Sequence, residues 1–152
     1  YEGRDNLRRG AREVTLVVNY GKMISRQFQH VETEILQMSE SCHQNEAIFN
    51  ILFESAFFGE DLKNIICKMA KRTDADYLET NALASLPQLK AICKDVVKLK
   101  LSGPGTLEGF QAAYAAGCER YASSGALTIA AEWKRILTEQ EEAAKKAAGQ
   151  TS

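Results

Sequence analysis

Two histidines and four cysteines are the residues from which acid–base, nucleophilic or metal chemistry would start in this chain. Cys42 and His43 are adjacent, but adjacent side chains on a helix point about 100° apart, so their spacing does not favour a catalytic pair. His30 and Glu34 lie at i,i+4, with Glu32 close by, and could form one edge of a metal site. A di-iron bundle would need Glu-x-x-His on other helices, and the sequence does not repeat it. We therefore predict no catalytic residue, no metal and no cofactor.

The motif and charge content excludes further functions. The sequence contains no GxSxG, HExxH, GxGxxG, P-loop or CxxC pattern. Nineteen Lys+Arg against twenty Asp+Glu give a net charge of -1, which argues against a nucleic-acid binder. No apolar run is long enough for a transmembrane helix. The chain begins with Tyr1 rather than Met, which indicates a mature or excised chain.

Acidic residues gather in one window of the chain. Seven acids and both histidines lie between Gln27 and Leu62, and no Lys or Arg interrupts them. In an antiparallel bundle this window would form one tip, which could bind a basic partner and respond to pH. The partner-binding candidates at this tip are Glu40, His43 and Glu46. The alternative is a solvated acidic tip without function.

Phenylalanines form a second cluster. Phe49, Phe53 and Phe57 are spaced i,i+4,i+8, and Phe58 adjoins them. We favour a role in the core, because the surrounding helix needs an inward face. The alternative is a hydrophobic partner site, since exposed apolar patches mark interfaces.

The first forty residues show a heptad pattern, which predicts one long helix packed as in a coiled coil. The apolar seam comprises Leu7, Val14, Gly21, Phe28, Ile35 and Cys42, with Gly10, Val17, Ile24, Val31 and Met38 three residues further on. No segment shows sustained alternation of period two, so we expect no sheet.

Later segments predict further helices. We expect them over 45–58, 61–72, 74–101 with a kink at Pro87, and from 107 onward after the turn at 102–105, with a break at 123–125. The predicted fold is all-α: an elongated antiparallel bundle of three to four helices, two of them long, with a kinked middle pair. Residues 1–152 would form one domain with a frayed tail from about 140.

Four cysteines fit two disulfides or four buried thiols equally well. Depths estimated along the expected helices, at about 1.5 Å per residue, exclude a bond between Cys42 and Cys67. They leave Cys93 and Cys118 as the pair within reach.

Two Ala-rich stretches carry a resemblance to a known family: Ala116–Tyr121 and Glu141–Gly149. Together with the long heptad helix and the kinked middle helices, they resemble the helical bundles of African trypanosome surface receptors and invariant surface glycoproteins. The resemblance implies an extracellular, lipid-anchored, non-enzymatic protein that binds a host macromolecule.

The functional hypothesis is a non-enzymatic protein-binding module, the ectodomain of a cell-surface protein with an unidentified protein partner. An extracellular location is favoured over a cytoplasmic one. The chain would fold as a monomeric unit, compatible with a homodimer. The alternative is an intracellular structural or adaptor bundle that assembles through helix–helix contacts.

Overall fold

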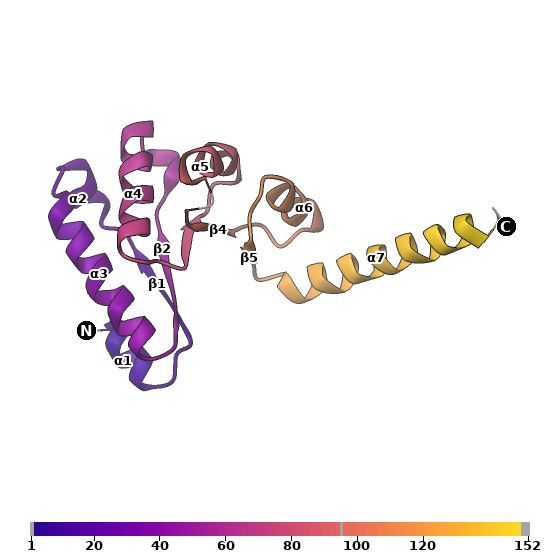
Figure 1. The fold of residues 1–152 in the computed structure, drawn as a ribbon, viewed down its shortest axis with the longest axis horizontal. Coiled ribbons are helices and arrows are strands. Elements are labelled where there is room, and N and C mark those ends of the chain that lie inside the picture. Colours follow the sequence, from indigo (N-terminus) through magenta and orange to yellow (C-terminus); the bar gives the residue numbers. More distant parts are fainter. Residues whose placement is uncertain (1, 95, 150–152) are drawn as a thin grey trace.

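The computed structural model describes residues 2–94 and 96–149, in which strands and helices alternate (Figure 1). The order is α1 (Glu2–Arg8), β1 (Glu13–Val17), α2 (Tyr20–Ile24), α3 (Phe28–Gln44), β2 (Ile48–Leu52), a 3-10 turn (Ser55–Phe57), α4 (Glu60–Arg72), β3 (Tyr77–Thr80), a second 3-10 turn (Leu83–Ser85), α5 (Leu86–Cys93), β4 (Lys98–Ser102), α6 (Leu107–Ala115), β5 (Arg120–Ala122) and α7 (Ala126–Gly149).

The five strands form one parallel sheet in the order β1-β2-β3-β4-β5. Two neighbouring parallel strands cannot be joined by a tight hairpin, so a helical crossover lies between each pair along the chain. All carboxyl ends of the strands therefore lie at one edge of the sheet, followed by the strand-to-helix turns.

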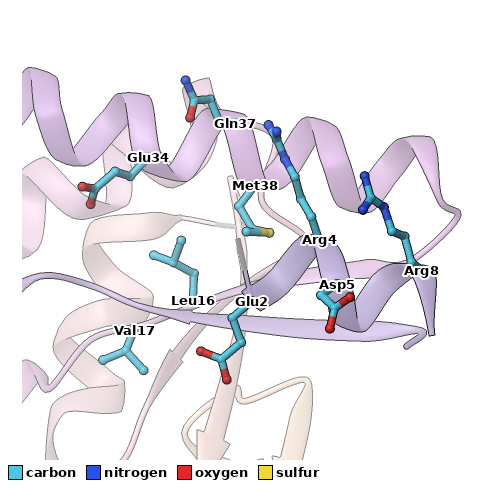
Figure 2. Close-up of a pocket in the computed structure, with 9 residues that line it drawn as sticks. All are labelled: Glu2, Arg4, Asp5, Arg8, Leu16, Val17, Glu34, Gln37 and Met38. Carbon is cyan, nitrogen blue, oxygen red and sulfur yellow. The ribbon is translucent and has the colours of Figure 1, made fainter. Parts of the chain in front are cut away.

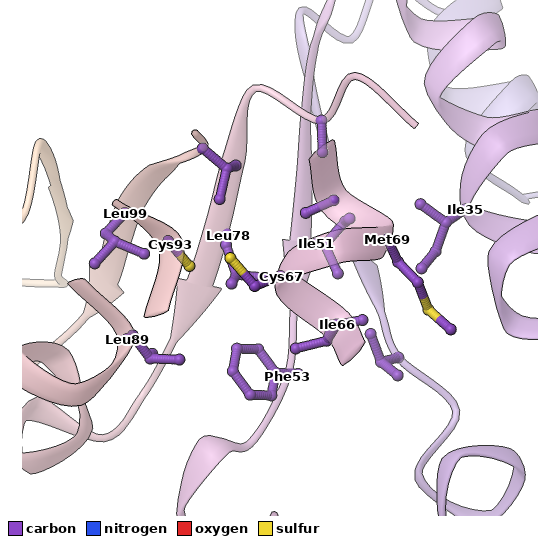
Figure 3. Close-up of a cluster of buried hydrophobic side chains, with 14 of the residues drawn as sticks. Ile35, Ile51, Phe53, Ile66, Cys67, Met69, Leu78, Leu89, Cys93 and Leu99 are labelled. Atoms are coloured by element: carbon purple, nitrogen blue, oxygen red, sulfur yellow. The ribbon is translucent and has the colours of Figure 1, made fainter. Parts of the chain in front are cut away.

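One face of the sheet packs against the helices and forms the core. Alternate strand residues point to this face, where their side chains are completely buried against α3, α4 and α5: Phe49, Ile51, Leu78, Leu99 and Leu101. The helices contribute residues such as Ile35, Ile66 and Leu89 to the same cluster (Figure 3). Burial of these apolar side chains fixes the register of every strand, since a slip of one residue would turn them outward.

Helix ends are placed by charge and backbone conformation. α4 has two acids, Glu60 and Asp61, in its first turn and ends on Lys71 and Arg72, which matches the helix dipole. α5 carries a proline in its first turn and ends where Lys94 adopts a left-handed conformation with φ 44°.

The last helix stands apart from this arrangement. α7 follows β5 at the edge of the sheet; its Trp133 packs against Phe110 and Tyr114 of α6, and the helix beyond extends away from the other elements (Figure 1). The part of the expected frayed tail from 140 to 149 belongs to this helix. Residues 150–152 lie outside the described residues.

The prediction of an all-α bundle was wrong, and the heptad region shows why. Ten of its eleven positions fall on four separate elements, α1, β1, α2 and α3, and Gly10 lies between α1 and β1. Positive φ angles at Gly10 and Arg26 interrupt the helix where the period predicted continuity. Only α3 carries part of the seam as a helix face, with Val31 and Ile35 buried. The rest of the period falls on β1, which has no fully buried residue, and on the short helices α1 and α2.

Two further predicted helices contain strands. The stretch 45–58 holds β2, and 74–101 holds β3, α5 and β4. A strand of a parallel sheet can be a short continuous apolar run, which periodicity alone does not distinguish from a buried helix. By contrast, the helix at 61–72 and the restart at Pro87 match α4 and α5. The helix expected from 107 to the break at 123–125 is α6 only as far as Ala115, and β5 follows it at Arg120–Ala122.

Candidate active site

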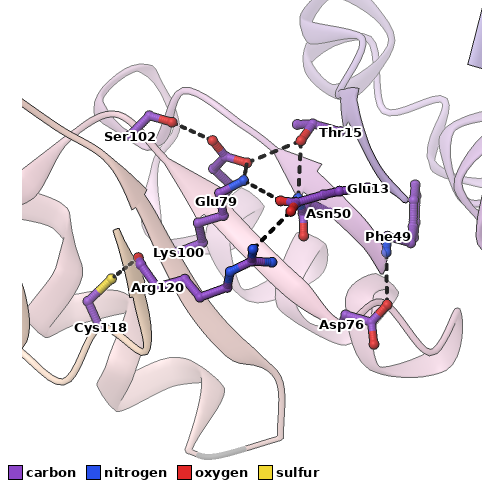
Figure 4. A network of polar contacts seen from close by, with 10 residues as sticks. All are labelled: Glu13, Thr15, Phe49, Asn50, Asp76, Glu79, Lys100, Ser102, Cys118 and Arg120. Atoms are coloured by element: carbon purple, nitrogen blue, oxygen red, sulfur yellow. Dashed lines mark hydrogen bonds and ion pairs between the residues drawn. The ribbon is translucent and has the colours of Figure 1, made fainter. Parts of the chain in front are cut away.

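Polar and charged side chains occupy the sheet face opposite the helices. We call this group the polar-face network (Figure 4); it comprises Glu13, Thr15, Asn50, Glu79, Lys100, Ser102 and Arg120. The sheet register brings its members together, since Glu79 pairs with Lys100 and Lys100 with Arg120 across adjacent strands. Such a face is notable, because strands of parallel sheets are usually apolar on both sides.

Lys100 occupies the centre of the network. Its Nζ lies 2.7 Å from Glu13 Oε1 and 3.1 Å from Glu79 Oε2. The side chain of Lys100 is only 9% exposed and that of Glu79 only 5%. Two opposite charges buried at this distance interact much more strongly than a surface pair.

Glu79 is held by hydroxyl groups as well as by the lysine. The Ser102 hydroxyl donates to Glu79 Oε1, and the Thr15 hydroxyl donates to Glu79 Oε2 at 3.4 Å. Because these donors come from β1 and β4, the carboxylate on β3 is fixed from both sides.

Glu13 connects the network to its more exposed side. Burial opposes ionisation of this carboxyl, but hydrogen bonds from Lys100 and Asn50 and the charges of Lys100 and Arg120 outweigh it. The pKa of Glu13 therefore lies below its ordinary value of 4.5. Arg120 Nη2 donates to Glu13 Oε2 at 2.9 Å, and the guanidinium also lies 5.1 Å from the centre of the Tyr77 ring.

Two polar atoms of this face have no hydrogen-bond partner among the described residues. They are Asn50 Oδ1, an acceptor, and Arg120 Nη1, a donor, and both are buried. Buried polar groups are nearly always satisfied in folded proteins. A polar ligand bound at this face would give both atoms a partner.

The turns after β4 and β5 meet beside the network. A Cβ atom at Gly125 would lie 2.7 Å from the carbonyl oxygen of Gly105, so the two turns approach more closely than any other residue would allow at that position. The Tyr121 hydroxyl donates to the carbonyl of Pro104 at 2.5 Å and holds the first turn. α6 begins after this turn, at Leu107, and α7 follows the second.

Together these turns could bind an anion. Helix N-termini and glycine turns present backbone N–H groups, and in parallel barrels the loops after two adjacent strands frequently bind phosphate. Ser102 ends β4 directly before the first turn and belongs to the polar-face network. A phosphorylated molecule bound at the turns would thus extend toward Lys100.

A separate cavity of about 900 Å³ opens between α1, β1 and α3 (Figure 2). Its lining mixes both charge signs, with Glu2, Asp5, Arg4 and Arg8 around Leu16 and Met38. Arg4 donates to Ser41, and Asp5 pairs with Arg9 on the surface of α1, so these charges act locally. The cavity contains no member of the polar-face network.

The described residues do not form a metal site. Within 2–94 and 96–149, no three His, Cys, Asp or Glu side chains are placed to hold a metal ion. His30 and Glu34 both lie on α3, where Glu34 forms an ion pair with Lys22 and Glu32 with Arg72.

The predicted acidic partner residues do not belong to the polar-face network. Glu40 and His43 are exposed on α3, and Glu46 follows in the turn before β2. His43 Nε2 lies 3.1 Å from Asp76 Oδ2, which also accepts from the Phe49 backbone N–H at 2.8 Å. These contacts give His43 a structural role at the start of β2.

The phenylalanine cluster divides between interior and surface. Phe49 and Phe53 are 0% and 1% exposed, as expected for core residues, whereas Phe57 is 65% exposed. Phe57 packs edge-on against Tyr20, with ring centres 6.3 Å apart. The three residues do not share a helix face, because the first belongs to a strand.

All four cysteines are free buried thiols. Cys93, expected beside Cys118, is hydrogen-bonded to Cys67, and this bond and burial both raise its pKa, while the same bond lowers the pKa of Cys67. The thiol of Cys118 donates to the carbonyl of Arg120 at 2.8 Å. Burial, together with the charge of Asp76, raises the pKa of Cys42 to about 11.

No member of the polar-face network was predicted from the sequence. The signal was present in short alternating stretches: Lys98-Leu99-Lys100-Leu101-Ser102 places polar residues at every second position. Ser102–Gly105 and Ser123–Gly125 were identified as a turn and a break, but not as two turns that meet. Pairing them requires knowledge that β4 and β5 are neighbours.

Comparison with known proteins gives a consistent result. A deoxyribose-phosphate aldolase of Lactobacillus acidophilus is 24% identical over 138 residues, covering 85% of this chain and 58% of that enzyme. One of Treponema denticola is 24% identical over 139 residues, covering 84% of this chain and 63% of that enzyme. The chain thus spans about three fifths of the length of these curated relatives. No protein-family model matches.

Solved structures show the same fold. An aldolase designated QR15 aligns with a TM-score of 0.79 at 23% identity, covering 90% of this chain and 66% of that one. The tetrameric deoxyribose phosphate aldolase from Aeropyrum pernix aligns with a TM-score of 0.77 at 18% identity, covering 89% of this chain and 60% of that one. The chain therefore has the α/β architecture of aldolase barrels.

These findings correct the functional hypothesis. The relatives are aldolases, so the resemblance to trypanosome surface receptors was wrong, as were the non-enzymatic ectodomain and the preference for a cell-surface location. That resemblance depended on Ala-rich helices, and helix composition is shared by many unrelated folds. Among the described residues, no helix is long and apolar enough to cross a membrane, in agreement with the prediction.

Proposed function

We propose that this chain supplies the substrate-binding and catalytic face of an aldolase-type enzyme that cleaves a small phosphorylated β-hydroxy aldehyde. The substrate class is that of deoxyribose phosphate, the compound named in the relatives. The observation that carries the proposal is the position of Lys100. It is a buried amine in the middle of β4, two residues before the strand ends at Ser102 and the first of two glycine turns suited to a phosphate begins.

The location matches the chemistry. Active sites of parallel α/β barrels lie at the carboxyl ends of the strands, where residues from several strands converge. Here Glu79 and Lys100 lie one and two residues before the carboxyl ends of β3 and β4, and Arg120, the first residue of β5, joins them through Glu13. Aldol cleavage breaks the bond between the carbons α and β to a carbonyl and leaves negative charge on the carbonyl fragment, which a nearby cation stabilises.

The direct test is the release of a two-carbon aldehyde from 2-deoxyribose 5-phosphate, followed with a coupled dehydrogenase. We expect cleavage by the unmodified protein and its loss in Lys100→Met. Unphosphorylated 2-deoxyribose should be a much poorer substrate, because it cannot use the turns after β4 and β5. Absence of cleavage in the correctly folded protein would refute the proposal.

A matched pair of variants tests the phosphate turns separately. Gly125→Ala places a methyl group against the Gly105 carbonyl and should raise KM for the phosphorylated substrate, whereas Gly21→Ala lies away from the turns and should not. An equal effect of Gly125→Ala on the unphosphorylated sugar would show that the turns do not bind phosphate.

A further inference from the structure

Two of the four cysteines face one another across the contact between α4 and α5. Cys67 lies in α4, and Cys93 is the last residue of α5. Figure 3 shows their sulfur atoms pointing toward one another, and the two thiols are close enough that each shifts the pKa of the other. The other two cysteines have different surroundings, since Cys118 donates to a backbone carbonyl and Cys42 lies near Asp76.

The arrangement of the two helices permits a covalent bond between these sulfur atoms. A disulfide requires Cα atoms within about 7 Å of one another. Packed helices lie about 8–10 Å apart between their axes, and each Cα lies about 2.3 Å from its own axis, so residues that face one another meet this requirement. Because α4 and α5 pack against one another, rotation of the side chains is enough to join Cys67 to Cys93.

A small cavity gives access to the pair. It has a volume of about 220 Å³, and both Cys67 and Cys93 line it. Its other lining residues are apolar, amide-bearing or basic: Ile92, Val96, Asn64, Lys68 and Lys71. Among the described residues, the lining contains no acid whose charge would oppose a thiolate. Cys67 is 5% exposed and Cys93 only 1%, so a reagent that reaches them has to be small.

A role in the core alone explains only part of this arrangement. Free cysteines are often small apolar core residues, and Cys42, which is 0% exposed, fits that role. Core packing does not require two thiols from different helices to meet, nor does it require them to meet beside a cavity. The position of Cys67 and Cys93 is instead that of a reactive thiol next to a second thiol that can capture it.

We infer that Cys67 and Cys93 form a redox-sensitive pair, which a hydroperoxide oxidises to a disulfide that joins α4 to α5. The inference is independent of the proposed function. Neither cysteine belongs to the polar-face network, because α4 and α5 cover the opposite face of the sheet.

The oxidation balances in two steps. The sulfur of Cys67, the more exposed thiol, attacks one oxygen of the hydroperoxide; the O–O bond breaks, and the leaving oxygen takes up the thiol proton. This gives a sulfenic acid at Cys67. The sulfur of Cys93 then attacks the sulfenic sulfur, the S–O bond breaks, and hydroxide leaves as water with the proton of Cys93. Two electrons pass from the thiols to the hydroperoxide.

The interaction between the thiols favours this order of events. Contact with Cys93 outweighs burial and lowers the pKa of Cys67, whereas contact with Cys67 and burial both raise the pKa of Cys93. The thiolate is the nucleophilic form of cysteine. Cys67 is therefore the thiol that attacks the hydroperoxide, and Cys93 is the one that completes the disulfide.

Peptide mapping without reduction tests the inference. The folded protein is treated with hydrogen peroxide, the remaining thiols are alkylated, and the peptides are analysed by mass spectrometry. We expect the free thiols to fall from four to two per chain, with Cys67 and Cys93 in one crosslinked peptide pair that dithiothreitol separates. The oxidised protein should also have a higher Tm, because the bond closes the loop 68–92 in the unfolded chain.

Matched variants separate the two roles. Cys93→Ser should accumulate the sulfenic acid at Cys67, which dimedone captures, whereas Cys67→Ser should show no crosslink at Cys93. Cys118→Ser removes a buried thiol outside the pair and should form the same disulfide as the unmodified protein. If either variant of the pair does not fold, the peptide map of the unmodified protein still decides.

Three results would overturn the inference. The first is a disulfide between Cys93 and Cys118 in place of the expected one. The second is oxidation of Cys67 to a sulfinic or sulfonic acid without a crosslink. The third is four unreacted thiols in the folded protein under peroxide treatment that oxidises the chain unfolded in urea, which would show that both cysteines serve only the core. None of these measurements depends on aldol cleavage, so failure of the proposed function would leave them unchanged.

Discussion

The two faces of the sheet are built from the same strands but are held together by different forces. On one face, Leu99 and Leu101 pack against helices and contribute through apolar burial. On the other, Lys100 lies between these same leucines in the sequence, and its amine interacts through charge with Glu13 and Glu79. The apolar face specifies the fold, whereas the polar face carries buried charges that are poorly explained by stability alone.

This difference indicates where function lies. Buried ion pairs contribute little net stability, because desolvation offsets much of their attraction. A cluster of two carboxylates and two cations on a parallel sheet is therefore better explained by what it binds. The following four predictions test that contrast between the faces.

The largest effect is expected for Lys100→Met. This change leaves the buried Glu79 without its cation, and loss of one partner of a buried pair costs about 3–5 kcal/mol. Chemical denaturation should show a lower unfolding free energy of that size. A change near zero would mean that water or rearranged side chains compensate for the carboxylates that have lost Lys100.

Leu99→Ala probes the apolar face one residue away. The Leu99 side chain is 0% exposed, and truncation of buried leucines costs about 2–5 kcal/mol through lost burial and a cavity. Calorimetry should detect this as a lower Tm. Because Leu99 does not face the network, the variant should keep its KM when assayed well below its Tm; a raised KM would show that the faces are coupled.

As the pH falls, the ion pairs of the polar face should weaken before the packing of the apolar face is affected. The pKa of Glu13 is lower in the folded chain than its ordinary value of 4.5, so its contribution to stability is present above that pH. It is lost as the pH falls through the lower, folded-state pKa, when protonation releases Lys100 and Arg120. Stability measured from pH 6 to pH 3 should fall less steeply in Glu13→Gln than in the unmodified protein. Parallel curves of stability against pH for Glu13→Gln and the unmodified protein would contradict this prediction.

The smallest effect is expected when the buried pair is replaced as a unit. Glu79→Gln combined with Lys100→Met removes both charges and retains a hydrogen-bond partner for Ser102. Such replacements are often close to neutral, so the double variant should lie within about 1 kcal/mol of the unmodified protein and be more stable than Lys100→Met alone. It should nevertheless be inactive. Additive losses from the two single changes would show that the residues do not interact.

Local chemistry allowed part of the fold to be predicted from the sequence. The helix at 61–72 was found because Asp61 and Arg72 match its dipole and its apolar positions share one face. Pro87 and the turn at 102–105 were placed because their backbone preferences act within a few residues. The same reasoning excluded a transmembrane helix, which depends only on a run of apolar residues.

Strands and the site were decided by tertiary structure. Residues 48–52 are apolar enough for a buried helix or a buried strand, and pairing with β1 and β3 selects the strand. Glu13, Glu79 and Lys100 are separated by dozens of residues, so no local spacing relates them. They meet because hydrogen bonds between parallel strands align their registers, and side chains on one face of a sheet become neighbours only when the strands are in place.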